Sequence, residues 1–104
     1  MKACCAAYLK EQFGGDEDVV GEIYGEYVSS MGEKLKEADE ALATAAWLPL
    51  DRIAHTIKGN ALAVGDEKMG QTAIDLRGAA QLQDLTLATA LVAQLKELAA
   101  TLES

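Results

Sequence analysis

The sequence is poor in the residues that strands and rigid turns require. Of its 104 residues only 5% are aromatic and one is proline, while Ala and Leu dominate where strands would need Val, Ile, Tyr and Thr. The composition therefore predicts an all-α fold. A chain of this length suits one hydrophobic core, so we expect a single domain over residues 1–104.

Cysteine is also scarce, because the two cysteines, Cys4 and Cys5, are neighbours near one end of the chain. Adjacent cysteines cannot link distant elements by disulfides, which fits a reducing compartment. The apolar stretch over residues 3–9 is shorter than a signal-peptide hydrophobic region and far below the roughly 20 residues that span a bilayer. We therefore expect a cytoplasmic location and no membrane contact.

Basic residues are outnumbered, since nine Lys and Arg face seventeen Asp and Glu, giving a net charge of −8. Such a chain repels nucleic acid backbones and anionic headgroups, so neither is an expected partner. The charge is uneven: residues 10–40 hold ten acidic and three basic residues, whereas residues 51–65 hold only Asp51, Arg52 and Lys58. The second segment is the least repulsive to an anion.

Apolar periodicity and helix-ending residues divide the chain into five helices. Gly14-Gly15 ends the first, and Pro49 suits the first turn of the third. An aspartate can cap each of the other three: Asp16, Asp66 and Asp84. The predicted helices span residues 3–13, 16–44, 49–64, 67–81 and 85–103. The expected apolar stripe of the last helix runs through Leu87, Leu91, Leu95, Leu98 and Leu102. Their amphipathic stripes and short connections predict an antiparallel up-down four-helix bundle, preceded by the short N-terminal helix.

Three glycines lie inside the second predicted helix: Gly21, Gly25 and Gly32. Each costs about 1 kcal/mol relative to Ala in a helix interior, so we expect them to mark close packing. Elsewhere the chain lacks a Gly-rich phosphate loop and any cluster of Cys and His, and we expect no metal site.

The single histidine, His55, is the most informative polar residue. A lone histidine is more often a hydrogen-bonded core residue or an idle surface residue than a reactive one. At about 100° per residue, the apolar positions from Leu50 to Val64 define the core side of this helix, and His55 lies about 140° away from it. The phase therefore predicts that His55 points outward.

Two positions one turn beyond His55 have a chemical use. Neutral imidazole is a good nucleophile near pH 7, and its attack on an aspartyl phosphate gives a phosphohistidine. Lys58 offers an ammonium group to the phosphoryl charge, and Gly59 leaves room beside the imidazole. A backbone packing contact is the alternative for Gly59. Leu62 on the same side is either a bundle-edge residue or part of an apolar docking patch.

The stretch Ala54-His55-Thr56-Ile57-Lys58-Gly59-Asn60-Ala61, followed by Val64-Gly65, resembles the histidine phosphotransfer (HPt) signature of Ala-His-Thr-Leu-Lys-Gly-Ser-Ala and a later Leu-Gly. The resemblance implies an up-down four-helix bundle in which His55 is phosphorylated by one receiver aspartate and discharges to another. It further implies that Lys58 stabilises the phosphoryl group and that Gly59 keeps the site open.

The same resemblance implies the partners, which are receiver domains of response regulators or a hybrid sensor histidine kinase. Mg²⁺ would belong to the partner receiver, and the chain itself would need no cofactor. We expect a monomeric phosphocarrier of a two-component phosphorelay, without autokinase activity.

Three positions depart from the signature. Asn60 replaces Ser, Ala63 stands where a polar residue is frequent, and Leu76-Arg77 replaces the usual Leu-Glu of the following helix. The first two bear on hydrogen bonds near the site or on partner choice. Because Arg77 is distant from His55 in sequence, we expect it to concern packing or surface charge.

Two alternative functions stay open at this point. One is a non-phosphorylated helical docking module for a receiver or another signalling partner, for which Asn60 is the first residue to examine. The other is a phosphorylated substrate domain cut from a larger, membrane-bound histidine kinase.

Overall fold

The computed structural model describes residues 1–103, and within that range the chain forms helices and no strands. The helices are α1 (Ala3–Phe13), α2 (Glu17–Ala43), α3 (Trp47–Ala63), α4 (Glu67–Gln81) and α5 (Leu85–Ala99). The predicted all-helical bundle with an additional N-terminal helix is confirmed. Ser104, which the predicted domain also includes, lies outside the described residues.

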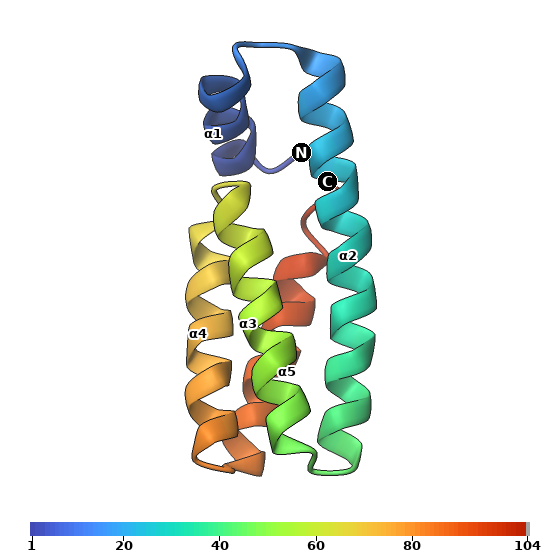
Figure 1. Ribbon diagram of the computed structural model, residues 1–104, viewed down its shortest axis with the longest axis vertical. Helices are drawn as coiled ribbons and strands as arrows, with labels where there is room; N and C mark the ends of the chain where they lie inside the picture. The colour runs from blue at the N-terminus through green and yellow to red at the C-terminus, as the bar shows by residue number, and fades with distance from the viewer. Residues whose placement is uncertain (104) are drawn as a thin grey trace.

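The helices form a rod of 43 × 19 × 18 Å. Figure 1 shows α2 to α5 running alternately down and up the long axis, with α1 beside the upper end of α2. Each of α2, α3, α4 and α5 packs against two of the others, so the four enclose one core. None of the helices over residues 1–103 has the length and apolar character needed to cross a membrane.

The helix ends follow the sequence signals with two exceptions. Helices α1 and α4 span the predicted residues, and α2 is one residue shorter at each end because Asp16 and Thr44 are its caps. Helix α3 begins at Trp47, two residues before the predicted start, and ends at Ala63, one residue before the predicted end, with Val64 as its cap. Pro49 is then its third residue, where a missing N–H costs nothing because the first N–H groups of a helix have no intrahelical partner.

The second exception is the end of α5, which lies at Ala99 and not at residue 103. The chain tightens there into a turn, in which the N–H of Leu102 donates to the carbonyl of Ala99 at 3.1 Å. This turn directs the Leu102 side chain into the core, where it is buried. Leu102, which the sequence placed inside the helix, therefore reaches the core from the turn that follows α5.

The three predicted aspartate caps are confirmed. A carboxylate oxygen of Asp16 accepts from the N–H of Val19 at 3.3 Å, and Asp84 accepts from Leu87 at 3.0 Å. Asp66 accepts from Met69 at 3.4 Å. Asp16 and Asp84 are exposed, whereas Asp66 is fully buried.

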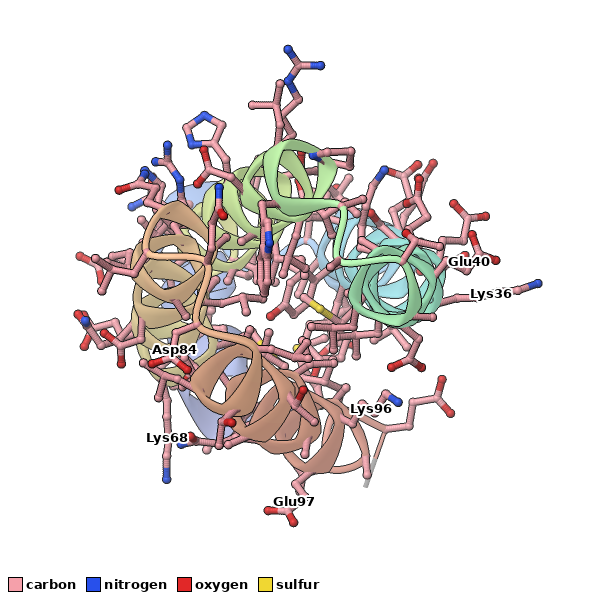
Figure 2. The ribbon with its side chains drawn as sticks, turned by 90° about the horizontal axis from the view of Figure 1, so that it is seen from below. Lys36, Glu40, Lys68, Asp84, Lys96 and Glu97 are labelled. Atoms are coloured by element: carbon pink, nitrogen blue, oxygen red, sulfur yellow. The ribbon has the colours of Figure 1, made fainter. Side chains whose placement is uncertain are left out.

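The core consists of the predicted apolar stripes with one correction on α5. Leu91 and Leu95 are buried as expected, but Leu87 is 43% exposed, and Ala88 and Val92 fill the core beside them. Viewed along the long axis in Figure 2, Lys36, Lys68 and Glu97 point away from the ring of helices. Among residues 1–103 the buried side chains are apolar except for Asp66 and Thr72.

The expectation that Gly21, Gly25 and Gly32 mark close packing is wrong. A Cβ atom added at any of the three would meet nothing within 4 Å. Close approach occurs instead at Gly65, where an added Cβ would lie 2.5 Å from the Cβ of Tyr8, and the backbone φ is +74°. Gly65 thus lets α1 lie directly on the connection between α3 and α4.

Buried polar contacts fasten α1 to the bundle. Asp66 accepts from the Lys2 ammonium at 2.9 Å and from the Tyr27 hydroxyl at 2.8 Å. Burial, together with the hydrogen bond to Asp66, raises the pKa of Tyr27 above its ordinary value, so this hydroxyl keeps its proton. One carboxylate therefore connects the N-terminal segment, α2 and the start of α4.

Candidate functional site

His55 lies halfway along α3 and is exposed. The neighbouring positions Ala54 and Ile57 are fully buried and face the core. The prediction that His55 points outward is therefore confirmed. Because the helix is anchored by buried residues on both sides of His55, the imidazole is presented from a rigid element.

The space beside His55 is open at Gly59. Gly59 lies one helical turn further along α3, and a Cβ atom added there would have no neighbour within 4 Å. This excludes the alternative that Gly59 permits a backbone packing contact. An incoming molecule therefore finds the space beside Gly59 free of other side chains.

Lys58 is half-buried and lies one turn beyond His55 on α3. The ion pairs found within residues 1–103 join other residues, which leaves its ammonium without a carboxylate partner in that part of the chain. A flexible cation of this kind can pair with an anion that arrives at His55.

Arg77 is the site residue that the sequence analysis missed. We expected it to concern packing or surface charge away from His55, and this expectation is wrong. Its Nη1 lies 3.2 Å from Nδ1 of His55, and its Nε donates to Oδ1 of Asp51 at 3.0 Å. Arg77 comes from α4, so the antiparallel packing of α3 against α4 brings these residues together.

Asp51 holds Arg77 in this position, and Gln81 in turn holds Asp51. Asp51 lies one turn before His55 on α3, and Gln81 lies one turn after Arg77 on α4. The Gln81 amide donates to the same Asp51 oxygen at 3.4 Å. The Asp51 and Arg77 side chains are only 21% and 31% exposed, so their ion pair is partly shielded from water. The guanidinium is therefore aimed at His55 by the carboxylate behind it.

The other departures from the HPt signature lie around this site without touching the imidazole. The Asn60 amide donates to the Ser30 hydroxyl at 3.1 Å and so joins α3 to α2. Ala63 is exposed. Asn60 thus strengthens the bundle on the side of α3 that faces α2.

Leu62 is 46% exposed and rests against α4. A Cβ atom added at Gly70 would lie 2.9 Å from Cδ2 of Leu62, so the leucine folds onto the glycine. Leu62 and Ile74 line an open hollow between α3 and α4. Both roles considered for Leu62, bundle edge and docking contact, are compatible with this position.

The arrangement can attract and hold an anionic group at an accessible nucleophile. The imidazole of His55 is an exposed nucleophilic group, Lys58 and Arg77 carry cationic groups on two adjacent helices, and the space at Gly59 is open. Nδ1 of the imidazole faces Arg77, which leaves Nε2, on the far side of the ring, as the nitrogen that a partner can reach.

Comparison with known proteins identifies a family. Residues 22–104 match the family model of the Hpt domain, a range that begins inside α2 and includes the helix bearing His55. No curated protein and no solved structure matches the chain. Because the family model covers most of the chain and the structure is all-helical, the chain belongs to the Hpt domain family, which carries out phosphotransfer in two-component signalling.

Proposed function

We propose that His55 accepts a phosphoryl group from a receiver-domain aspartate and passes it to the aspartate of another response regulator. The observation that supports this most directly is the exposed imidazole at the centre of α3 beside the open space at Gly59. A lone pair on Nε2 forms the bond to phosphorus, the P–O bond to the aspartate breaks, and the carboxylate leaves with the electron pair. The second transfer reverses these steps.

Lys58 stabilises the phosphoryl group on His55. A phosphorylated side chain carries close to two negative charges at neutral pH, and a charge-assisted hydrogen bond to an ammonium group compensates part of them. Lys58→Ala should therefore slow transfer while leaving the helical content unchanged. Phosphotransfer at normal speed in this variant would remove Lys58 from the site.

Gly59 provides the room that an incoming receiver needs. Gly59→Gln places a long side chain in space that is empty in the free protein, so the variant should fold normally and fail to dock. Its affinity for a receiver can be measured by titration calorimetry. Wild-type transfer by Gly59→Gln would contradict the steric argument.

The chemistry at His55 divides the catalytic groups between two proteins. We expect the receiver to contribute its aspartate and a bound Mg²⁺, and this chain to contribute the nucleophile and the two cations. Leu62 extends the contact as part of the docking surface. We expect a monomeric, cytoplasmic carrier whose partners are receiver domains or a hybrid sensor histidine kinase.

The deciding experiment is incubation of the protein with a phosphorylated receiver domain and Mg²⁺, followed by detection of acid-labile phosphate. His55 is the single histidine of the chain, so labelling that disappears in His55→Gln assigns the site without mapping. Robust labelling of His55→Gln, or none on the wild type across a panel of receivers, would contradict the proposal. Receiver binding without labelling would support the alternative of a docking module.

A further inference from the structure

The contact between Arg77 and His55 determines which ring nitrogen carries the proton. A guanidinium group has donors only, and its pKa lies too high for it to lose a proton in a protein. Its hydrogen bond to Nδ1, at 3.2 Å, therefore requires that Nδ1 be the acceptor. In the neutral imidazole the proton then sits on Nε2.

Asp51 fixes the orientation of the guanidinium that donates this hydrogen bond. The guanidinium also donates from Nε to Asp51 at 3.0 Å, and the pair is partly shielded between α3 and α4. Because the guanidinium is planar and rigid, an ion pair at Nε fixes the directions of its other N–H groups. Arg77 therefore favours one protonation pattern of the ring and does not adapt to the other.

We propose that Arg77 is a positioning residue that keeps Nδ1 of His55 unprotonated and thereby prolongs the lifetime of the phosphohistidine. The inference deepens the proposed function, since it concerns the phosphorylated state of the same histidine. With the phosphoryl group on Nε2, Nδ1 keeps its lone pair and can still accept from Arg77. The hydrogen bond seen in the free protein is thus complementary to the phosphorylated ring.

The effect on lifetime follows from where the electrons go in hydrolysis. Water adds to phosphorus, the P–N bond breaks, and its electron pair goes to Nε2. If Nδ1 carries a proton, the leaving group is a neutral imidazole; if it does not, the leaving group is an imidazolate anion, which is much poorer. Protonation of Nδ1 would break the hydrogen bond and place a proton against a guanidinium cation, so Arg77 slows the loss of phosphate.

The same contact opposes phosphorylation of the free ring. Nε2 can attack only when its lone pair is available, which requires the proton to move to Nδ1 and Arg77 to release it. After the transfer Nδ1 loses this proton to solvent and can again accept from Arg77. Arg77 therefore slows both gain and loss of the phosphoryl group until a bound partner alters the contact. Arg77 on α4 contacts the imidazole directly, and the charged residues within one turn of His55 on α3 are Asp51, Arg52 and Lys58.

The first test measures the lifetime of the phosphohistidine without any receiver. Phosphoramidate transfers its phosphoryl group directly to imidazole nitrogens, and hydrolysis at neutral pH can be followed by ³¹P NMR. In Arg77→Met, which keeps the aliphatic stem and loses the donors, hydrolysis should be about fivefold faster, the factor contributed by one net hydrogen bond of ordinary strength. Arg77→Lys keeps a donor and should recover part of the lifetime.

A matched control is available on α4. Lys68 is exposed and points away from the ring of helices (Figure 2), so Lys68→Met makes the same change in net charge away from the imidazole. Its phosphohistidine should hydrolyse at the wild-type rate. Equal acceleration in Lys68→Met and Arg77→Met would show an effect of net charge alone and overturn the proposal.

The second test reads the protonation pattern in the unphosphorylated protein. The ¹⁵N shifts of the two imidazole nitrogens distinguish the Nδ1–H form from the Nε2–H form, and the ratio of Nδ1–H to Nε2–H should rise about fivefold in Arg77→Met. An unchanged ratio, or a lifetime that does not shorten, would overturn the proposal. Both tests are independent of receivers, so their failure leaves the relay function intact, and a lack of receiver transfer leaves them valid.

Discussion

Replacement of Asp66 by alanine should destabilise the fold far more than loss of a surface cap. The carboxylate caps α4, which contributes about 1 kcal/mol. Its removal also leaves the hydroxyl of Tyr27, a residue that is 4% exposed, without its acceptor, which costs about 1–3 kcal/mol. Lys2 is 20% exposed and can turn to water, so its loss adds little. We expect a decrease of about 3 kcal/mol in the free energy of unfolding.

The assay is urea denaturation followed by far-UV circular dichroism, with the free energy extrapolated to zero denaturant. Asp84→Ala is the matched control, because Asp84 caps α5 through a 3.0 Å hydrogen bond and is exposed. It should cost about 1 kcal/mol. The difference between the two variants, about 2 kcal/mol, then measures the buried contacts of Asp66 beyond capping.

A double-mutant cycle with Tyr27→Phe identifies the partner. Tyr27→Phe should cost about 1 kcal/mol in the wild type and nothing, or a small gain, in Asp66→Ala, because the unpaired hydroxyl is then removed. Equal costs for Asp66→Ala and Asp84→Ala, or strict additivity in the cycle, would refute the role assigned to the buried carboxylate.

Three further predictions concern stability. Gly25→Ala should stabilise the protein by about 0.5–1 kcal/mol, because the added methyl group meets nothing within 4 Å; a loss of stability in urea would contradict this. Gly65→Ala should cost about 2–4 kcal/mol and expose α1 to limited proteolysis, because a Cβ would lie 2.5 Å from Tyr8 on a backbone with φ +74°. Alkaline pH should destabilise the fold, because burial raises the pKa of Cys5 from 9.0 to about 12 and the unfolded thiol loses its proton first. The contribution of the buried thiol to the free energy of unfolding is complete below pH 9. It falls by up to about 1.4 kcal/mol per pH unit between pH 9 and about 12. The free energy of unfolding of Cys5→Ala should depend less on pH over this range.

Local patterns predicted the parts of the fold and site that depend on neighbouring residues. The exposure of His55 follows from helical phase, and the caps follow from an aspartate before each apolar stripe. On α5 the helical phase did not separate two adjacent residues, Leu87 and Ala88, because either could face the core. The packing of the bundle buries Ala88 and leaves Leu87 exposed.

Contacts between distant residues could not be predicted in this way. The pairing of Arg77 with His55 depends on the register of α4 against α3, which a single sequence does not specify. Asp66 was correctly predicted as a cap, yet its partners Lys2 and Tyr27 lie 64 and 39 residues away. The expectation for the glycines of α2 was wrong because a glycine lowers the stability of a helix by the same amount whether or not another element packs against it.

Of the three departures from the phosphotransfer signature, Arg77 is the one that contacts the imidazole of His55. Where the usual residue is Glu, an acceptor would face the imidazole, whereas Arg77 presents a donor. The substitution therefore reverses the polarity of the contact with Nδ1. A change that we expected to concern packing or surface charge therefore lies against the imidazole of His55.

The hydroxyl of Tyr24 holds the two ends of the described chain together. It accepts from the backbone N–H of Lys2 at 3.2 Å and donates to the carbonyl of Leu102 at 2.6 Å, and Figure 1 shows the two chain ends side by side. Domains with adjacent ends tolerate circular permutation and insertion into other proteins. A short linker between these ends, with new ends opened in the exposed connection at Leu82-Gln83, would preserve every helix. Because the new ends would be neighbouring residues, the permuted domain, with its histidine, could be inserted into a loop of a host protein.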